Sequence, residues 1–223
     1  RFTSIGPVIG QELRDKAVWA IGGVALIIVL YVGFAFLGVG KPVSSWIYGS
    51  TAIFVLVHDV LVPAAVMSLL GYFAGVEVDV LFVMAILAVL GYSVNDTIVV
   101  FDRVRENLVK YRQEKKHIVK DPTGMPREEI EYLFTKPFGD IVGMSVEQTI
   151  VRSLNTSITT LLALTTLYLL GGEVTKTFAL ILIAGVAAGA YSSIFLASPL
   201  LVWYAEYRER RSAKKEVTEP AST

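Results

Sequence analysis

Five long apolar stretches are the strongest constraint on how this 223-residue chain can fold. A helix that crosses a lipid bilayer needs about 20 mostly apolar residues, and each stretch reaches that length. They cover residues 17–37, 46–73, 80–101, 149–170 and 178–204. No strand-like alternation competes with them, and lipid tolerates only helices or closed barrels. The sequence therefore predicts an all-α, polytopic membrane helix bundle.

The composition agrees with a membrane location and excludes several functional classes. Hydrophobic residues make up 54% of the chain, above the about 45–50% that is usual in soluble domains. The net charge is formally zero, which gives no reason to expect nucleic acid, and there is no cysteine. Two histidines without a clustered partner predict no metal site. Without a phosphate-binding loop or a hydrolase motif, we expect neither an enzyme nor a cofactor.

The distribution of lysine and arginine predicts the orientation. Three connections between the apolar stretches are short, so consecutive helices should be antiparallel neighbours. The long connection at 102–148 and the tail at 205–223 are rich in lysine and arginine, and the positive-inside rule places both in the cytoplasm. Residues 1–16 then lead into the membrane domain, residues 17–204, from outside. An exported start without a leader suggests that a preceding helix is missing.

The hydrophilic segments give three further expectations. Residues 103–107 should continue the third helix into the cytoplasm. Several prolines and glycines interrupt the rest of the long connection, so we expect a loop there, with a short helix at 127–134. The tail after Arg211 is polar and charged, which is typical of a disordered segment.

The third apolar stretch ends in "GYSVNDTIVVFDRVREN", residues 91–107, which places Asn95 and Asp96 inside a predicted span. A carboxylate there costs about 2.5–3.5 kcal/mol on insertion scales. At about 100° per residue, Asp96 shares an arc with Tyr92 and Ser93, with Asn95 and Thr97 at its edges. We therefore expect Asp96 to face other helices as a titratable group in a proton or ion pathway. The alternative is a carboxylate that only satisfies a helix contact.

A polar stripe begins at Arg152 in the fourth apolar stretch. Arg152, Asn155, Thr156 and Thr159 have the i, i+3, i+4, i+7 spacing of one helix face. Such a stripe is costly in a membrane unless it faces a cavity or another helix. We expect Arg152 to lie near Asp96 and keep it ionised, so that separating the two lets Asp96 take a proton. Alternatively, Arg152 extends its long side chain to the cytoplasmic interface.

His58 and Asp59 lie in the middle of the second apolar stretch, just before Pro63. Adjacent helical positions point about 100° apart, so we do not expect these two side chains to bond each other. Pro63 removes the amide that would bond the Asp59 carbonyl, which favours a kink. The pair is either a further part of a proton relay or a contact that holds neighbouring helices.

Small residues recur every four positions in the last apolar stretch, at Gly185, Gly189 and Ser193. This spacing allows two helices to approach closely in a membrane. It predicts helix packing, within the chain or against a partner.

Taken together, these stretches resemble the SecF-type members of the SecD/SecF family of bacterial protein-export membrane proteins. The resemblance rests on "SIGPVIGQEL" (residues 4–13), the His58–Asp59 pair, residues 91–107 and "RSLNTSITTLL" (residues 152–162). The family belongs to the resistance–nodulation–division superfamily of proton-driven transporters. A typical member has six membrane helices and an extracytoplasmic domain between the first two. The resemblance implies that this chain holds the last five helices, with that domain missing.

The resemblance also implies a function and its partners. SecF-type proteins use the proton motive force, with SecD, to promote late translocation of unfolded polypeptides across the bacterial cytoplasmic membrane. SecYEG, YajC and SecA are the further partners it implies, besides protons and membrane lipid. It assigns the proton relay to Asp96 and Arg152, with Asp102 at another motif position. Two alternatives are a proton-driven exporter of lipids or drugs and a purely structural subunit. The segment at 113–139 is longer than is usual for the family.

Overall fold

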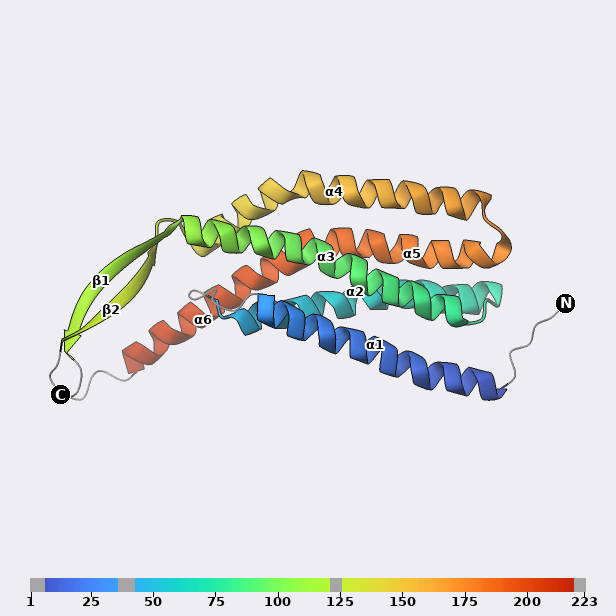
Figure 1. The fold of residues 1–223 in the computed structure, drawn as a ribbon, viewed down its shortest axis with the longest axis horizontal. Coiled ribbons are helices and arrows are strands. Elements are labelled where there is room, and N and C mark those ends of the chain that lie inside the picture. Colours follow the sequence, from blue (N-terminus) through green and yellow to red (C-terminus); the bar gives the residue numbers. More distant parts are fainter. Residues whose placement is uncertain (1–6, 36–42, 121–125, 219–223) are drawn as a thin grey trace.

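The chain folds into a bundle of long helices with one β-hairpin at its end (Figure 1). The computed structural model describes residues 7–35, 43–120 and 126–218. The helices are α1 (Pro7–Ala35), α2 (Ser45–Ala74), α3 (Val80–Lys110), α4 (Phe138–Leu170), α5 (Glu173–Ser192), the π-helix η1 (Ser193–Ala197) and α6 (Ser198–Thr218). Five helical stretches in the described residues are long and apolar enough to cross a membrane, with α5, η1 and α6 forming one of them. The predicted polytopic helix bundle is confirmed.

Short turns bring consecutive helices side by side. Gly75 ends α2 with a φ of 65°, the left-handed conformation that glycine adopts without strain. Asp79 then caps α3, because its side chain accepts a hydrogen bond from the Phe82 amide at 3.0 Å. Gly171 and Gly172, both in an extended conformation, connect α4 to α5 by a turn of two residues. α3 lies centrally and packs against α1, α2, α4 and α5.

The buried core lies along α3 and faces the other helices. At one end, Tyr48 and Phe101 pack edge to face with ring centroids 5.3 Å apart, and Leu201 of α6 lies in the same cluster. A second cluster forms towards the other end, around Val89 and Ile181. Large apolar side chains also cover the outside of the bundle, as a protein surrounded by lipid requires.

α3 and α5 approach each other closely at two glycines. A Cβ atom on Gly185 would lie 2.1 Å from Cγ2 of Val89, and one on Gly189 would lie 3.1 Å from Cβ of Ser93. The contact at Gly185 leaves no room for a Cβ atom, and the contact at Gly189 is tight. The first two residues of the predicted small-residue ridge therefore lie at an interface within the chain.

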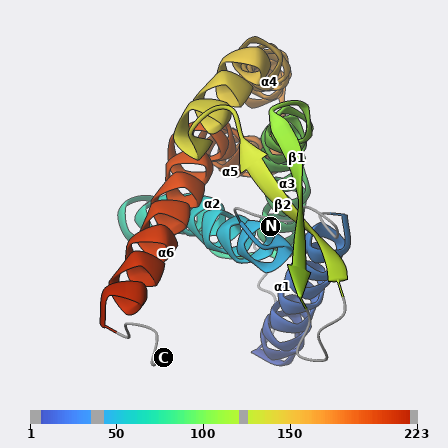
Figure 2. The same cartoon turned by 90° about the vertical axis from the view of Figure 1, so that its left-hand side faces the viewer.

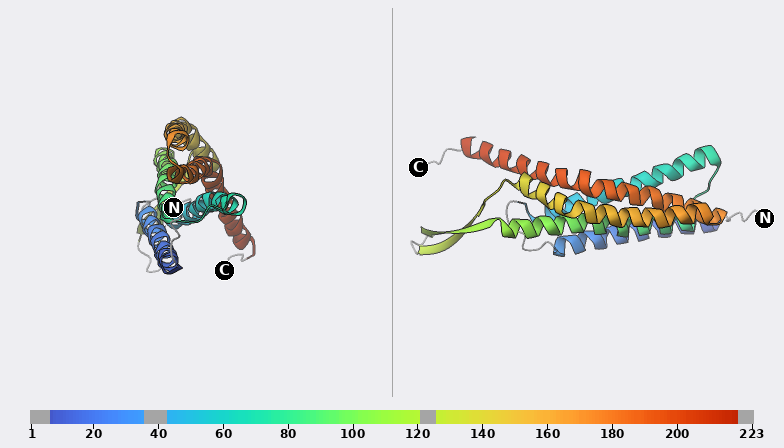
Figure 3. Two further views of the ribbon diagram at one scale, coloured as in Figure 1. Left: turned by 90° about the vertical axis from the view of Figure 1, so that its right-hand side faces the viewer. Right: turned by 90° about the horizontal axis from the view of Figure 1, so that it is seen from above.

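The long connection is a β-hairpin, and the helix predicted at 127–134 is wrong. β1 (Arg112–Lys120) and β2 (Pro126–Phe134) are antiparallel, with Arg112 opposite Phe134. A helix of two turns is marginal in water, whereas pairing with β1 satisfies the backbone of the same segment. Figures 1 and 3 show the hairpin extending beyond the helices at the end where the C-terminus lies.

Several helices run further than the apolar stretches indicate. α1 begins at Pro7, α3 continues to Lys110, and α4 begins at Phe138, so the connection between α3 and α4 is shorter than the predicted 102–148. The disorder predicted after Arg211 is also wrong, because α6 continues to Thr218. In Figure 2, α6 diverges from the remaining helices towards the C-terminus. Residues 219–223 lie outside the described part of the chain.

Candidate functional site: two buried carboxylates

The first buried carboxylate, Asp96, lies between α3 and α4. The residue is 3% exposed, and its Oδ2 accepts a hydrogen bond from the Ser157 hydroxyl at 3.3 Å. Ser153, one turn earlier on α4, is buried on the same face of the helix. Tyr92 extends the contact, because its hydroxyl donates to Thr160 at 3.3 Å. Asp96 therefore faces hydroxyl groups of the neighbouring helix, as its position on the polar arc predicts.

A seam of polar side chains continues along the same helix pair. Asn107 Nδ2 donates to the Ser145 hydroxyl at 2.9 Å and to Gln148 Oε1 at 3.1 Å. On α4 the buried polar positions are spaced by four residues: Ser145, Thr149, Ser153 and Ser157. The Thr149 hydroxyl donates to the Ser145 carbonyl of the same helix at 2.9 Å. Polar groups thus line the α3–α4 interface over several helical turns.

Arg152 does not contact Asp96, and the expected pairing is absent from this structure. Arg152 is exposed, and none of the ion pairs among the described residues joins it to Asp96. Asn155, Thr156 and Thr159 are exposed on the same side of α4. The reason is geometric: one residue turns the helix by about 100°, so a face that directs Ser153 towards α3 directs Arg152 away from it.

The remaining candidates on α3 separate into buried and exposed positions. Thr97 is 1% exposed and donates to the Ser93 carbonyl at 3.3 Å. Asn95 is exposed on the outside of the bundle. Asp102 is exposed as well, with Arg105 NH1 3.9 Å from its Oδ1. Only Thr97 therefore joins Asp96 on the buried face.

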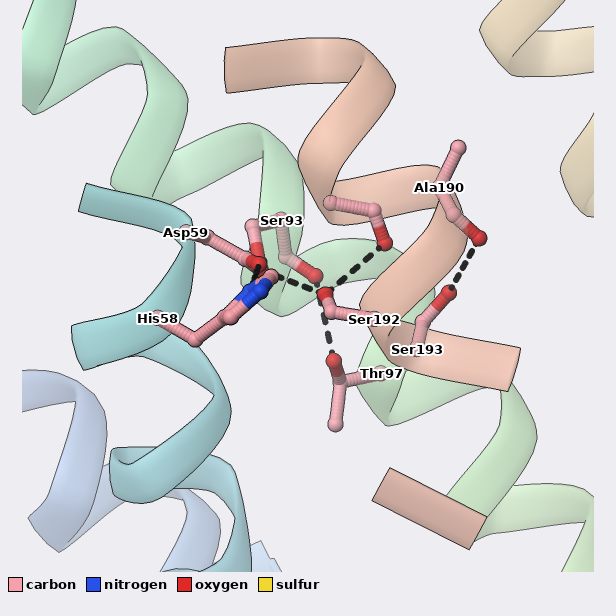
Figure 4. Close-up of polar contacts among 8 residues, drawn as sticks. His58, Asp59, Ser93, Thr97, Ala190, Ser192 and Ser193 are labelled. Atoms are coloured by element: carbon pink, nitrogen blue, oxygen red, sulfur yellow. Dashed lines mark hydrogen bonds and ion pairs between the residues drawn. The ribbon is translucent and has the colours of Figure 1, made fainter. Parts of the chain in front are cut away.

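The second buried carboxylate, Asp59, lies where α2, α3 and α5 meet (Figure 4). The residue is 0% exposed. Its Oδ2 accepts hydrogen bonds from the hydroxyls of Ser93 and Ser192, the latter at 2.7 Å. Its Oδ1 lies 2.8 Å from Nδ1 of His58. Three helices thus place their polar side chains around one carboxylate.

The contact between His58 and Asp59 corrects the expectation that these side chains stay apart. The Cβ atoms of adjacent residues diverge, but the two side chains rotate about χ1 and χ2 until the ring nitrogen reaches the carboxylate. The His58 side chain remains 36% exposed, so it connects the fully buried Asp59 carboxylate to the surface of the helix bundle. Pro63, one turn later, lies within the continuous helix α2.

Sequence reasoning missed four hydroxyl groups that bind or flank the two carboxylates: Ser93 as a partner of Asp59, Ser192, Ser153 and Ser157. A signal for the α4 pair was present, because serine and threonine recur every four residues from Ser145 to Ser157. For Ser192 no comparable spacing exists.

The arrangement can exchange protons but offers no grouped metal ligands. Among the described residues, no three histidine or acidic side chains lie close enough together to hold a metal ion. Each carboxylate is buried in a membrane helix and bonded by neutral hydroxyls. Groups of this kind are expensive in a membrane and mark ion or proton pathways. The fold and the site together define a multi-pass membrane protein with ionisable groups in its interior.

The chain belongs to the family described as "Protein export membrane protein SecD/SecF, C-terminal", which it matches over residues 1–123 and 126–207. The resemblance to this family is thereby confirmed.

Individual relatives give the same result. The chain is 41% identical over its whole length to "Protein translocase subunit SecF" of Thermobaculum terrenum and covers 62% of that protein. It is 36% identical to the same subunit of Synechocystis, over 97% of the chain and 59% of the relative. The chain thus spans about three fifths of the length of these relatives.

The fold is also that of a solved structure. The crystal structure of SecDF from Thermus thermophilus, described as a translocon-associated membrane protein, has a TM-score of 0.71 and 36% identity. It covers 91% of this chain, which in turn covers 23% of that protein. A second crystal structure, of SecDF in a super-membrane-facing form, has a TM-score of 0.70 and 34% identity.

Proposed function

We propose that this chain is the membrane part of a SecF-type subunit that uses the proton motive force to promote late translocation of polypeptides. The observation that carries the proposal is Asp96, a carboxylate 3% exposed within a membrane helix. It accepts a hydrogen bond from the Ser157 hydroxyl, and no ion pair among the described residues joins it to a cation. A carboxyl group in such surroundings readily gains and loses a proton.

The relay alternates between two environments of Asp96. In the arrangement described above, Asp96 faces Ser157, and Arg152 faces away. A rotation of α4 by about one residue, or 100°, exchanges Ser153 for Arg152 beside the carboxylate. The guanidinium then favours the ionised form, and its withdrawal favours protonation. Asn95, Asn155, Thr156 and Asp102 line the outward side and complete the relay towards a partner, whereas His58 and Asp59 belong to its inner side.

The exposed stripe on α4 supports a partner within the membrane. Polar and charged side chains in membrane helices are rare and almost always face other helices or a cavity rather than lipid. Arg152, Asn155, Thr156 and Thr159 are all exposed in the isolated chain, so a second membrane protein is needed to cover them. We assign this position to SecD, because the Thermus thermophilus relative is named SecDF and contains a region 36% identical to this chain.

The available energy limits what each cycle can do. One proton crossing the membrane releases about 2.3 kcal/mol per 100 mV of potential. This amount biases a domain motion, but it does not unfold a stable protein. The substrate is therefore an unfolded polypeptide that SecYEG already holds, with SecA acting earlier and YajC as an associated subunit.

The location follows from the same proposal. The protein spans the bacterial cytoplasmic membrane with residues 1–16 outside and the C-terminal tail in the cytoplasm. The β-hairpin and the end of α6 lie at one end of the bundle (Figure 1) and carry many of the basic residues, which supports a cytoplasmic position for that end.

The test is export in vesicles that contain the full-length protein with SecD and SecYEG. Asp96→Asn keeps the size of the side chain but cannot ionise, and we expect it to abolish the stimulation of late translocation by the proton motive force. Glu106→Gln is the matched control, because Glu106 is an exposed carboxylate on the same helix. Full stimulation with Asp96→Asn would refute the proposal.

A further inference from the structure

The Asp59 carboxylate has polar contacts with three side chains. Ser93 from α3, Ser192 from α5 and His58 from α2 all direct polar atoms to its two oxygens. Figure 4 shows the three side chains converging on the carboxylate from separate helices. A hydroxyl or an N–H group donates to an ionised carboxylate, which has only acceptors. The two hydroxyl donors at Oδ2 match the acceptor-only oxygens of an ionised carboxylate.

Protonation of Asp59 disturbs this arrangement directly. A neutral carboxyl group carries one O–H donor and loses acceptor capacity at that oxygen. Ser93 and Ser192 both bond Oδ2, so a proton on this oxygen requires at least one hydroxyl to turn away. A proton on Oδ1 instead weakens the negative charge that holds both hydroxyls. In either case the connection between α3, α2 and α5 weakens.

Ser192 already has a second acceptor within reach. Its hydroxyl lies 2.7 Å from Asp59 Oδ2 and 3.2 Å from the Gly189 carbonyl of its own helix. A single hydroxyl hydrogen serves one acceptor well at a time. The state of Asp59 therefore decides whether Ser192 bonds α2 or its own helix.

The π-helix begins directly after Ser192. It covers Ser193–Ala197 and separates α5 from α6. π-helical turns are rare, occur frequently at functional sites, and bend the helix that contains them. Beyond this turn α6 diverges from the bundle (Figure 2). A change at Ser192 thus acts directly beside the π-helical turn through which α5 continues into α6.

The surroundings of Asp59 contain few other ionisable groups. α2 contributes His58. α3 contributes the Ser93 hydroxyl and, one turn later on the buried face, Asp96, which bonds α4 instead. α5 has no titratable residue between Lys176 and Tyr191. His58 is therefore the side chain positioned to pass a proton to Asp59, because its Nδ1 lies 2.8 Å from Oδ1.

We propose that Asp59 is a second proton-binding site, loaded through His58, whose ionisation state controls the direction of α6 through Ser192 and the π-helix. In the loading step, imidazolium His58 gives its Nδ1 proton to Asp59 Oδ1. The products are neutral imidazole, with its remaining hydrogen on Nε2, and a neutral carboxyl group. The proposal deepens the proton-driven function proposed above and rests on it.

The test measures the position of α6 at different pH values in the full-length protein with its partner, reconstituted in lipid. This chain has no cysteine, so after replacement of any cysteine elsewhere in the full-length protein and its partner, spin labels can be placed at Val109→Cys on α3 and Arg208→Cys on α6, both exposed. We expect a label-to-label distance that changes with pH. Asp59→Asn should hold the low-pH distance at every pH.

Two serine variants distinguish an effect of Asp59 ionisation from a purely structural effect of Asp59→Asn. Ser192→Ala keeps the carboxylate and should abolish the pH dependence of the distance. Ser193→Ala is the matched control, because the Ser193 hydroxyl donates to Ala190 of its own helix at 3.3 Å and does not contact Asp59. We expect it to behave as the wild type. Wild-type pH dependence in Asp59→Asn, or equal damage from both serine variants, would overturn the proposal.

Asp96→Asn in the same samples separates this proposal from the proposed function. We expect that variant to lose proton flux while the pH dependence of the α6 distance persists. A proton flux in Asp96→Asn equal to that of the wild type would refute the relay through Asp96. Even then, a label-to-label distance that no longer changes with pH in Asp59→Asn would support Asp59 as a second proton-binding site.

Discussion

At the scale of single residues, the chemistry of this protein depends on hydroxyl groups beside carboxylates. Ser157 bonds Asp96, and Ser192 bonds Asp59. A hydrogen bond to a charged group contributes about 1.5–3 kcal/mol, and its loss inside a membrane cannot be offset by water. Each serine therefore influences when its carboxylate is ionised, although serine itself does not titrate.

Ser157→Ala should reduce proton flux about tenfold or more in vesicles that contain the assembled protein. The variant removes the donor to Asp96 and a contact of the Tyr92 hydroxyl, and 1.4 kcal/mol corresponds to a factor of ten. Thr166→Ala is the control, because Thr166 is exposed on the same helix and bonds only the Leu162 carbonyl. Equal flux in the two variants would contradict the assigned position of Ser157.

The sequence predicts the buried carboxylates better than their partners. Asp96 is recognisable because a charge inside an apolar stretch has to face other helices. Which side chains of α4 contact Asp96 depends on the rotation of α4 about its axis. From the sequence, the polar stripe from Arg152 to Thr159 and the one from Ser145 to Ser157 are both candidates for the face towards α3. The sequence favours Arg152 as the partner of Asp96, but helix packing directs Ser153 and Ser157 towards α3. Rotations of this size are set by contacts between helices that are distant in sequence.

At the scale of helices and strands, the close contact of α3 and α5 fixes the geometry around Asp59. Val89 and Ser93 of α3 face Gly185 and Gly189 of α5. The Ser93 hydroxyl reaches Asp59 from this interface. Any widening of the interface therefore moves a ligand of Asp59.

Gly185→Ala should lower the thermal stability of the assembled protein in lipid or detergent. The new Cβ would lie 2.1 Å from Val89 Cγ2, and overpacking of this kind costs about 1–3 kcal/mol. Val89→Ala in the same chain removes the clash and should restore most of the melting temperature. An unchanged melting temperature in Gly185→Ala, or no rescue by Val89→Ala, would count against the close contact.

The elements themselves are mostly readable from the sequence, with the hairpin as the exception. Apolar runs identify the membrane helices because the bilayer imposes their length. The pairing of Arg112–Lys120 with Pro126–Phe134 is different. Strand pairing depends on a partner segment, and no length or periodicity rule for membrane helices applies to a hairpin outside the membrane.

At the scale of the whole molecule, the positions of the connections define the two sides of the membrane. The hairpin and α6 lie at one end of the bundle, and the α4–α5 turn lies at the other (Figures 1 and 3). The proposed orientation puts the hairpin end in the cytoplasm.

Single cysteines can test this orientation, since this chain has none and any cysteine elsewhere in the protein can be replaced. Val109 at the end of α3 and Val174 at the start of α5 are both exposed and lie at opposite ends. In spheroplasts, a membrane-impermeant maleimide should label Val174→Cys. It should leave Val109→Cys unlabelled until the cytoplasmic membrane is permeabilised. The reverse pattern would invert the proposed topology.

The central claim, that Asp96 carries protons across the membrane, is tested most directly by proton flux. The full-length protein and its partner are reconstituted in vesicles under an imposed pH gradient, and the internal pH is followed for Asp96→Asn and the control Glu106→Gln. We expect the flux of Asp96→Asn to fall to the level of empty vesicles, and that of Glu106→Gln to match the wild type. Wild-type flux in a correctly assembled Asp96→Asn variant would contradict the claim.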